Sequence, residues 1–362
     1  MQAAVMQRPV VSTGRASWGS RRVSAHARVI LADNPSPLTY LGTNTWILAD
    51  PGSPACVVVD PGPDSAPHLR AVQRACAEDG HEVAAVLLTH DHADHAEGAE
   101  RFAAMTGAPV LSRRSGTLPD GPLDLGAGAP RLEAVPLPGH ASDLVGFLMP
   151  SDASVVTGDM LFKQSSTLIC WPDGSLATYL ASLERLRATV VERNVARLLT
   201  AHGPLIDHPL EAIDRGYRHR LDRLERVRAA SEAGRGLRSV RLGRIIEAVY
   251  QDVDARLDPA ARINIQAQLE YLASPASCRP ERRRRDRVSI LSSPCMREGR
   301  GACPGLLLSS AVSLFPYSFF MRLASSLASS KRFTLPVAVF GISSMYSMRS
   351  GHRRLATCFS AR

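Results

Sequence analysis

The stretch Thr89-His90-Asp91-His92-Ala93-Asp94-His95 decides the fold and the chemistry that this sequence predicts. It follows an apolar run, residues 83–88, that reads as a buried strand. Because strand side chains alternate, the first two histidines should point to the same side, and the final carboxylate and histidine should lie in the following turn. Neutral imidazoles and carboxylates bind zinc and its first-row neighbours. A solvated polar loop would not need these histidines, and a closed structural zinc site would use cysteines, none of which lies nearby.

Three more polar residues also follow segments that read as strands. They are His140 in Pro-Gly-His, Asp159 in Gly-Asp and His202 in His-Gly-Pro. Alone, each histidine would more often be a core or surface residue, and Asp159 a turn carboxylate. Strands that end at one edge of a sheet bring their side chains to one place. The recurrence therefore predicts a shared metal site.

Both strands and helices are expected between residues 27 and 272, and we see no internal repeat. The expected strands cover 27–31, 43–48, 56–60, 83–88, 109–112, 132–137, 144–149, 154–157 and 196–200, and the expected helices 66–79, 97–105, 175–192, 209–233, 242–250 and 259–272.

The positive charge of the chain is concentrated at its two ends. The formal net charge is +9, but residues 1–32 contain no acid, and the residues from Arg279 onward are rich in arginine. The body between them is mildly acidic, so the high pI says nothing about the substrate. The cysteines before Cys278 form no CxxC spacing, which fits reduced thiols and a cytoplasmic location.

Both ends are expected to lie outside the folded body. Residues 1–26 are interpreted as a disordered leader or as the result of a start codon placed too early; they lack the apolar core of a secretory signal, and organellar targeting stays open. Residues 278–362 are interpreted as a tail that is disordered or mispredicted through a frameshift. Its arginine run at 282–285 could bind nucleic acid, but a disordered basic tail is preferred. Its uncharged segment 301–321 contains Ser, Gly and Pro, which argues against a membrane span.

Taken together, His-x-His-x-Asp-His, Pro-Gly-His, Gly-Asp and the late His-Gly-Pro resemble the metallo-β-lactamase superfamily over roughly residues 27–208. The resemblance implies an α/β fold, an αββα sandwich with a dinuclear metal site on one edge. Residue by residue, it implies a first metal bound by His90, His92 and His140, a second bound by Asp94, His95 and His202, and Asp159 bridging both. The turn at 42–45 also resembles an early turn of this family.

The position of Asp159 narrows the resemblance. The commonest metal-dependent β-lactamases have Cys there, and a carboxylate instead resembles the glyoxalase II-like and nuclease-like branches. The helices expected within 209–277 resemble the small winged-helix domain of the β-lactamase-like endoribonucleases, although no wing follows Leu272. The excess of arginine over 215–244 could bind nucleic acid or be a solvated helix face.

The expected activity is hydrolysis by a hydroxide that bridges two metal ions. Two zinc ions are the default, with manganese or iron possible, because nitrogen and oxygen ligands accept all three. Asp94 is expected to orient the hydroxide as well as to bind metal, and Asp91 is a candidate partner for a metal-binding histidine. The substrate is predicted to be single-stranded RNA or, alternatively, a thioester or lactone. A third hypothesis, a DNA-binding module with a vestigial hydrolase fold, fits poorly with an intact ligand set. Oligomeric state is not predicted.

Overall fold

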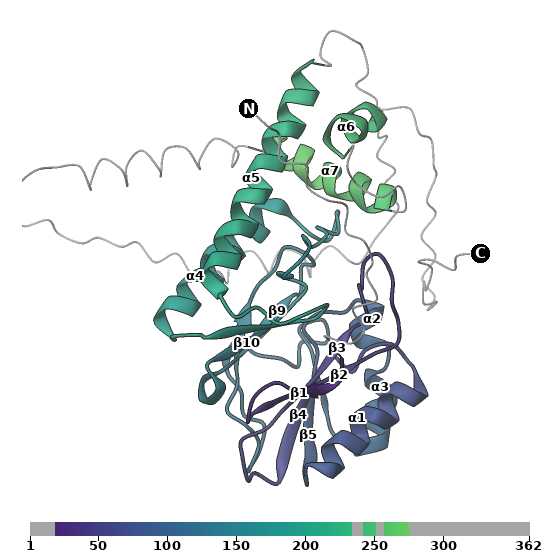
Figure 1. The fold of residues 1–362 in the computed structure, drawn as a ribbon, viewed down its shortest axis with the longest axis vertical. Helices are drawn as coiled ribbons and strands as arrows, with labels where there is room; N and C mark the ends of the chain where they lie inside the picture. The colour runs from purple at the N-terminus through teal and green to yellow at the C-terminus, as the bar shows by residue number, and fades with distance from the viewer. Residues whose placement is uncertain (1–18, 234–241, 251–256, 275–362) are drawn as a thin grey trace, which may run out of the picture. The chain divides into compact units, whose positions relative to one another are not determined.

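The computed structural model describes residues 19–233, 242–250 and 257–274, which form two sheets with helices on their outer faces (Figure 1). The first sheet contains, in spatial order, β1 Arg21–Arg22, β2 Ala27–Leu31, β3 Asn44–Leu48, β4 Ala55–Val59, β5 Glu82–Leu87 and β6 Val110–Leu111. Within the described residues the first strand begins at Arg21, earlier than the expected Ala27, because β1 pairs antiparallel with β2.

Strands β4, β5 and β6 run parallel to one another, so their carboxyl ends lie at the same edge of the first sheet. The helix α1, Ala66–Glu78, connects β4 to β5, and the helices α2, Ala93–Ala96, and α3, Ala99–Thr106, lie between β5 and β6. The 89–95 stretch starts two residues after β5 ends. It is therefore delivered to this edge.

The second sheet has the order β11 Arg197–Thr200, β10 Ser154–Gly158, β9 Val145–Met149, β8 Glu133–Pro136 and β7 Gly121–Pro122, with a short 3₁₀ helix, Pro150–Asp152, between β9 and β10. Strands β10 and β11 are parallel, and α4, Leu176–Glu192, makes the crossover between them. Asp159 and His202 follow their carboxyl ends, so they too reach a common edge.

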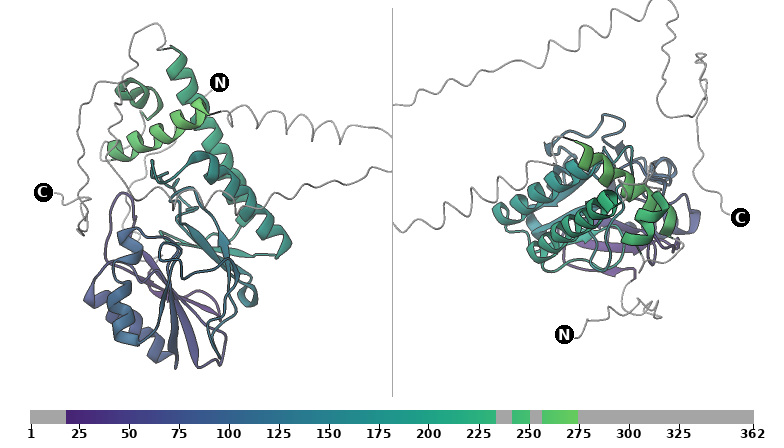
Figure 2. Two further views of the ribbon diagram at one scale, coloured as in Figure 1. Left: turned by 180° about the vertical axis from the view of Figure 1, so that it is seen from behind. Right: turned by 90° about the horizontal axis from the view of Figure 1, so that it is seen from above.

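Three apolar cores separate four layers. Trp46 and Val59 of the first sheet share one core with Phe147 and Leu199 of the second. The outer face of the first sheet packs on α1 and α3, and the outer face of the second packs on α4. Figures 1 and 2 show α1 and α3 on one side of the sheets and α4 on the other. The expected mixed α/β fold with two sheets is confirmed.

After the second sheet, the part of the chain that the structure describes contains the helices α5, Pro209–Ala233, α6, Leu242–Val249, and α7, Asp258–Ala273. Val227, Ile245 and Ile265 unite them in a small core, while α5 and α7 also pack on the core beneath α4. A wing after Leu272 and the predicted tail at 278–362 would lie outside the described residues. Among those residues, no helix is long and apolar enough to cross a membrane.

The helix α1 carries a buried histidine, His68, whose surroundings disfavour its protonated form. His68 is 6% exposed, and its Nε2 lies 2.9 Å from Thr45 Oγ1, which itself donates to the Asp60 carbonyl. Burial lowers the pKa of His68 to about 4. The folded state therefore resists protonation that the unfolded chain accepts below its ordinary pKa of about 6.5.

We predict that His68 makes the metal-free protein less stable as the pH falls from about 6.5 to about 4, by up to about 3 kcal/mol. The sign follows because the unfolded state binds more protons than the folded state in this window. Urea unfolding at pH 7.5 and pH 4.5 should show a smaller pH dependence for His68→Gln than for the wild type. Equal pH dependence in the two proteins would contradict the prediction.

Candidate metal centre

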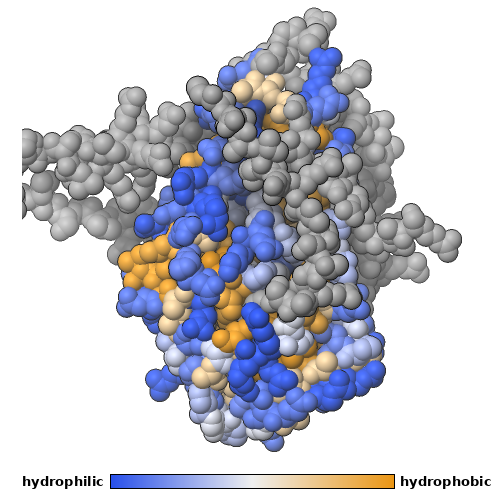
Figure 3. Space-filling model, viewed as in Figure 1, coloured by the Kyte–Doolittle hydropathy of each residue, from blue (hydrophilic) through white to orange (hydrophobic). Residues whose placement is uncertain are grey.

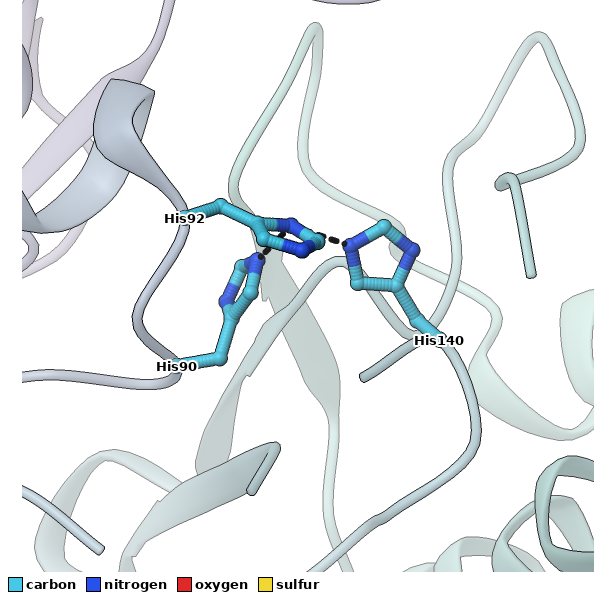
Figure 4. A group of neighbouring side chains, drawn as sticks. All are labelled: His90, His92 and His140. Carbon is cyan, nitrogen blue, oxygen red and sulfur yellow. Dashed lines mark hydrogen bonds between the residues drawn. The ribbon is translucent and has the colours of Figure 1, made fainter. Parts of the chain in front are cut away.

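The first group of ligand-type side chains is formed by His90, His92 and His140. The Nε2 atoms of His90 and His140 each lie 2.9 Å from Nδ1 of His92. Figure 4 shows the three rings converging from two separate segments of the chain, the loop after β5 and the loop after β8. His90 and His140 are buried and His92 is half-buried.

The second group is formed by Asp94, His95 and His202. Oδ2 of Asp94 lies 3.5 Å from Nε2 of His95 and 3.3 Å from Nε2 of His202. Both histidines are buried, whereas the Asp94 side chain is 32% exposed. Asp94 is thus the part of this group that solvent or a substrate can reach.

Asp159 lies between the two groups and turns one oxygen to each. Its Oδ1 is 3.3 Å from Nε2 of His95 and 3.4 Å from Nε2 of His202, while its Oδ2 is 3.5 Å from Nε2 of His140. A carboxylate in this position can bind a cation on either side. The structure thus brings together all seven residues that the sequence analysis selected.

Four of the five imidazoles use their second nitrogen to bond to the protein. The partners of these Nδ1 atoms are Asp60 Oδ2 for His95 at 2.9 Å, the Leu168 carbonyl for His140 at 2.6 Å, the Gly42 carbonyl for His202 at 3.3 Å, and Thr89 Oγ1 for His90 at 3.0 Å. An Nδ1–H that donates outward leaves Nε2 unprotonated and directed into the centre. Only His92 presents Nδ1 instead.

Asp60 holds Thr89 and His95 in place through hydrogen bonds, and the sequence analysis did not identify it. The residue is 1% exposed, and its carboxylate accepts hydrogen bonds from the Thr89 N–H, the Thr89 hydroxyl and His95 Nδ1 at 2.8, 2.7 and 2.9 Å. Through the Thr89 hydroxyl it also supports His90. Asp60 follows β4, the parallel neighbour of β5, and this placement is the signal that could have identified it.

Asp91 does not have the role that we expected. It is exposed, and its Oδ2 pairs with Nε of Arg114 at 3.2 Å. The carboxylate that bonds to a histidine of the centre is Asp60. Asp91 points to solvent because it lies between His90 and His92, both of which turn inward.

The early turn at 42–45 orients His202. The Gly42 carbonyl accepts the Nδ1–H of His202, and the Asn44 amide donates to the Thr200 and Gly203 carbonyls at 2.9 and 2.8 Å. Gly42 has φ 133°, and a Cβ there would lie 1.9 Å from the Ala32 carbonyl oxygen, so only glycine fits. This turn was expected from the resemblance, and its physical role is to hold the last histidine.

The electrostatics of the centre fit a bound cation. Burial, with His95 and His140 adding to it, lowers the pKa of His90 well below its usual range; burial also lowers the pKa of His140 to about 4. Burial would lower the pKa of His95 too, but Asp94, Asp159 and Asp60 outweigh it and raise that pKa well above its usual range. The centre therefore contains neutral imidazoles, those of His90 and His140, next to His95, where the nearby carboxylates favour a positive charge.

Two buried atoms identify that point. Nε2 of His95 and Oδ1 of Asp159 have no hydrogen-bond partner among the described residues. Burying such atoms unpaired is costly unless a ligand satisfies them. Likewise, a single proton on His92 Nδ1 can serve only one of the two Nε2 atoms that lie 2.9 Å from it. A metal ion in each group would satisfy all of these atoms, so the residues fit the expected ions.

The centre and the fold have known relatives. A family profile described as the beta-lactamase superfamily domain matches residues 56–137. A Caenorhabditis elegans protein named beta-lactamase-like protein 2 homolog is 24% identical over 211 residues, covering 54% of this chain and 67% of that protein. A hydroxyacylglutathione hydrolase from Ectopseudomonas mendocina is 32% identical over 123 residues, covering 32% of this chain and 46% of that protein.

A solved structure supports the same fold. A beta-lactamase domain protein from Burkholderia ambifaria aligns with a TM-score of 0.56 and 21% identity, covering 70% of this chain and 89% of that one. The family profile and the sequence relatives agree with the superfamily that the motifs resemble, and the solved structure agrees with the fold.

We predict that Asp60→Asn weakens metal binding at the position of His95 by about 10- to 100-fold. Asparagine tolerates the left-handed backbone of Asp60, φ 50°, so the change removes the charge without backbone strain. Competition titration of the metal-free protein with zinc and a chromogenic chelator measures the affinity. Asp91→Asn is the matched control, and equal losses in both variants would show that Asp60 has no special role.

Proposed function

We propose that this chain is a hydrolase of the metallo-β-lactamase superfamily that binds two metal ions and uses them to hydrolyse its substrate. His90, His92 and His140 would hold one ion, and Asp94, His95 and His202 the other. The observation that carries the proposal is the position of Asp159, whose two oxygens face the two groups. A carboxylate shared in this way is typical of two-metal sites.

When bound, such ions supply a nucleophile at neutral pH and polarise the substrate oxygen. The residues of the chain orient the attacking water and exclude bulk water. Asp94 is the more exposed of the two carboxylates of the centre, and although its partial burial opposes ionisation, His95 and His202 hold its pKa well below the usual range. It therefore stays ionised and can accept a hydrogen bond from the attacking water, which makes it the proposed catalytic residue. The buried histidines exclude bulk water on the other sides.

Zinc is the metal that we propose first. Five imidazoles and two carboxylates suit zinc, and manganese or iron would accept the same ligands. No sulfur ligand is proposed, because Sγ of Cys170, the cysteine near His140, lies 3.9 Å from Nδ1 of His140, the ring nitrogen that faces away from the centre.

Single-stranded RNA is the proposed substrate. Within the proposed division into a catalytic domain at 27–208 and a winged-helix-like domain at 209–277, α5 carries the exposed arginines Arg215, Arg218 and Arg226. Figure 3 shows hydrophilic residues, next to a hydrophobic patch, on the side where Figure 1 places α5. These side chains could bind phosphates, and a cytoplasmic location belongs to the same proposal.

Some arginines of α5 contact the protein and are therefore not available to bind RNA. The RNA-binding role proposed for the arginines of 215–244 is accordingly limited to the exposed ones. Arg223 lies 4.3 Å above the ring of Tyr250 and donates to the Val249 carbonyl at 2.5 Å. Arg220 is 5% exposed and donates to the Thr167 carbonyl. These two guanidiniums hold the fold together, so a test of RNA binding should use the exposed arginines.

A thioester or lactone is the second candidate substrate. The relative named hydroxyacylglutathione hydrolase favours it. So do the carboxylates of Asp91, Asp143 and Asp173, which lie around the guanidinium of Arg114 on the side of the centre near His92. A polyanion would meet repulsion on this side of the centre, whereas a small ester would not.

We predict that the wild type binds about two zinc ions per chain and that Asp159→Ala loses at least one of them. The rate of hydrolysis should fall by about 100-fold or more, since Asp159 faces both groups. Elemental analysis and an assay with RNA, thioester and lactone substrates provide the measurements. Asp207→Asn, an exposed carboxylate change, is the control; a wild type with less than about one ion per chain would refute the proposed centre.

We also predict that replacing Arg218 and Arg226 with glutamine weakens RNA binding and lowers its salt slope by about 0.7 for each phosphate that is no longer bound. Zinc content should not change. Arg70→Gln with Arg74→Gln removes the same charge from exposed positions of α1, and it should leave RNA binding unaltered. Similar salt slopes for all three proteins, or no RNA cleavage by the wild type, would favour the thioester or lactone.

A further inference from the structure

His140 is oriented by a loop without regular structure. The 159–175 loop connects β10 to α4, and no helix or strand lies within it. The Leu168 carbonyl in this loop accepts the Nδ1–H of His140 at 2.6 Å, and the Cys170 N–H donates to the His140 carbonyl at 2.9 Å. The direction of His140 Nε2 therefore depends on where the loop is held.

Side chains from α5 and α7 hold this loop on both sides of Leu168. Arg220 donates to the Thr167 carbonyl, Asn264 Oδ1 accepts the Ile169 N–H at 3.0 Å, and Glu270 Oε2 accepts the Trp171 Nε1–H at 2.8 Å. Residues separated by about 50 to 100 positions in the sequence thus meet within five consecutive residues of the loop.

These contacts lie in a well-packed region. Ile169 is 1% exposed and shares an apolar core with Ala267 and Tyr271 of α7. The Arg220 guanidinium lies 4.8 Å from the centre of the Tyr179 ring and is almost fully buried. A buried guanidinium is stable only with its partners in place, which fixes the loop relative to α5.

We propose that Asn264 of α7 is a positioning residue for the metal site that contains His140. Its Oδ1 satisfies the buried N–H of Ile169, which holds the adjacent Leu168 carbonyl where His140 needs it. Helix α7 would thus help to orient a metal-binding histidine, and this role does not depend on which substrate the enzyme uses. This inference rests on the proposed metal site and adds α7 to the parts that build it.

The chemistry of the amide separates positioning from packing. Leucine at 264 keeps the branched outline of asparagine, with bulkier methyl groups, but cannot accept the Ile169 N–H. Aspartate keeps the acceptor oxygen. If positioning is the role of Asn264, the leucine variant loses metal affinity and the aspartate variant retains it.

Zinc titration of metal-free wild type, Asn264→Leu and Asn264→Asp tests this, with His140→Ala marking which zinc equivalent depends on His140. Asn264→Leu should weaken that equivalent about tenfold and leave the other unchanged, and Asn264→Asp should stay within about twofold of the wild type. Equal affinity of Asn264→Leu and wild type would overturn the inference. So would a parallel loss of both equivalents together with a lower melting temperature, which indicates packing alone.

The outcome separates this inference from the proposed function. A wild type that binds no zinc refutes the metal centre and the inference together, whereas two zinc ions with no effect of Asn264→Leu refute only the inference. If Asn264→Leu does not fold, Glu270→Leu removes an exposed contact to the same loop. It should weaken the His140-dependent equivalent at least about threefold, and unchanged affinity would again overturn the inference.

Discussion

The lone pairs of five imidazoles and the charges of two carboxylates converge on one small volume, and the rest of the structure holds them there. Without positive charge this arrangement would be unfavourable, because buried acceptors would face one another unpaired. Much of this unfavourable free energy arises at Asp159, because His95 and His202 face one of its oxygens and His140 faces the other. The arrangement of these atoms suits bound cations, and the stability of the fold offsets the free energy that is needed to hold them together without one.

Parallel strand pairs explain how one fold assembles the centre. In each sheet the carboxyl ends of adjacent parallel strands meet at an edge, and the loops that leave those ends carry the polar side chains. Asp60 and the 89–95 stretch come from β4 and β5, and Asp159 and His202 from β10 and β11. The shared core between the sheets, with Trp46 and Phe147, fixes one edge against the other.

The sequence predicted what depends on local patterns and missed what depends on distant contacts. The strands ending before His90, Asp159 and His202 were found within one or two residues, because each is a short apolar run that stops at a polar motif. Asp60 was read only as the end of a strand, since one carboxylate before Pro-Gly gives no local sign of a histidine partner 35 positions away. Arg223 was grouped with surface arginines because its contact with Tyr250 depends on how α5 and α6 pack.

The central claim is that Asp159 lies between two metal ions, and anomalous diffraction from crystals grown with zinc tests it most directly. Data collected on both sides of the zinc absorption edge would locate each ion without reference to activity. Two peaks about 3.5–4 Å apart are predicted, one among His90, His92 and His140 and one beside Asp94 and His202, with an oxygen of Asp159 bound to each. A single peak, or two peaks that Asp159 does not touch, would contradict the account.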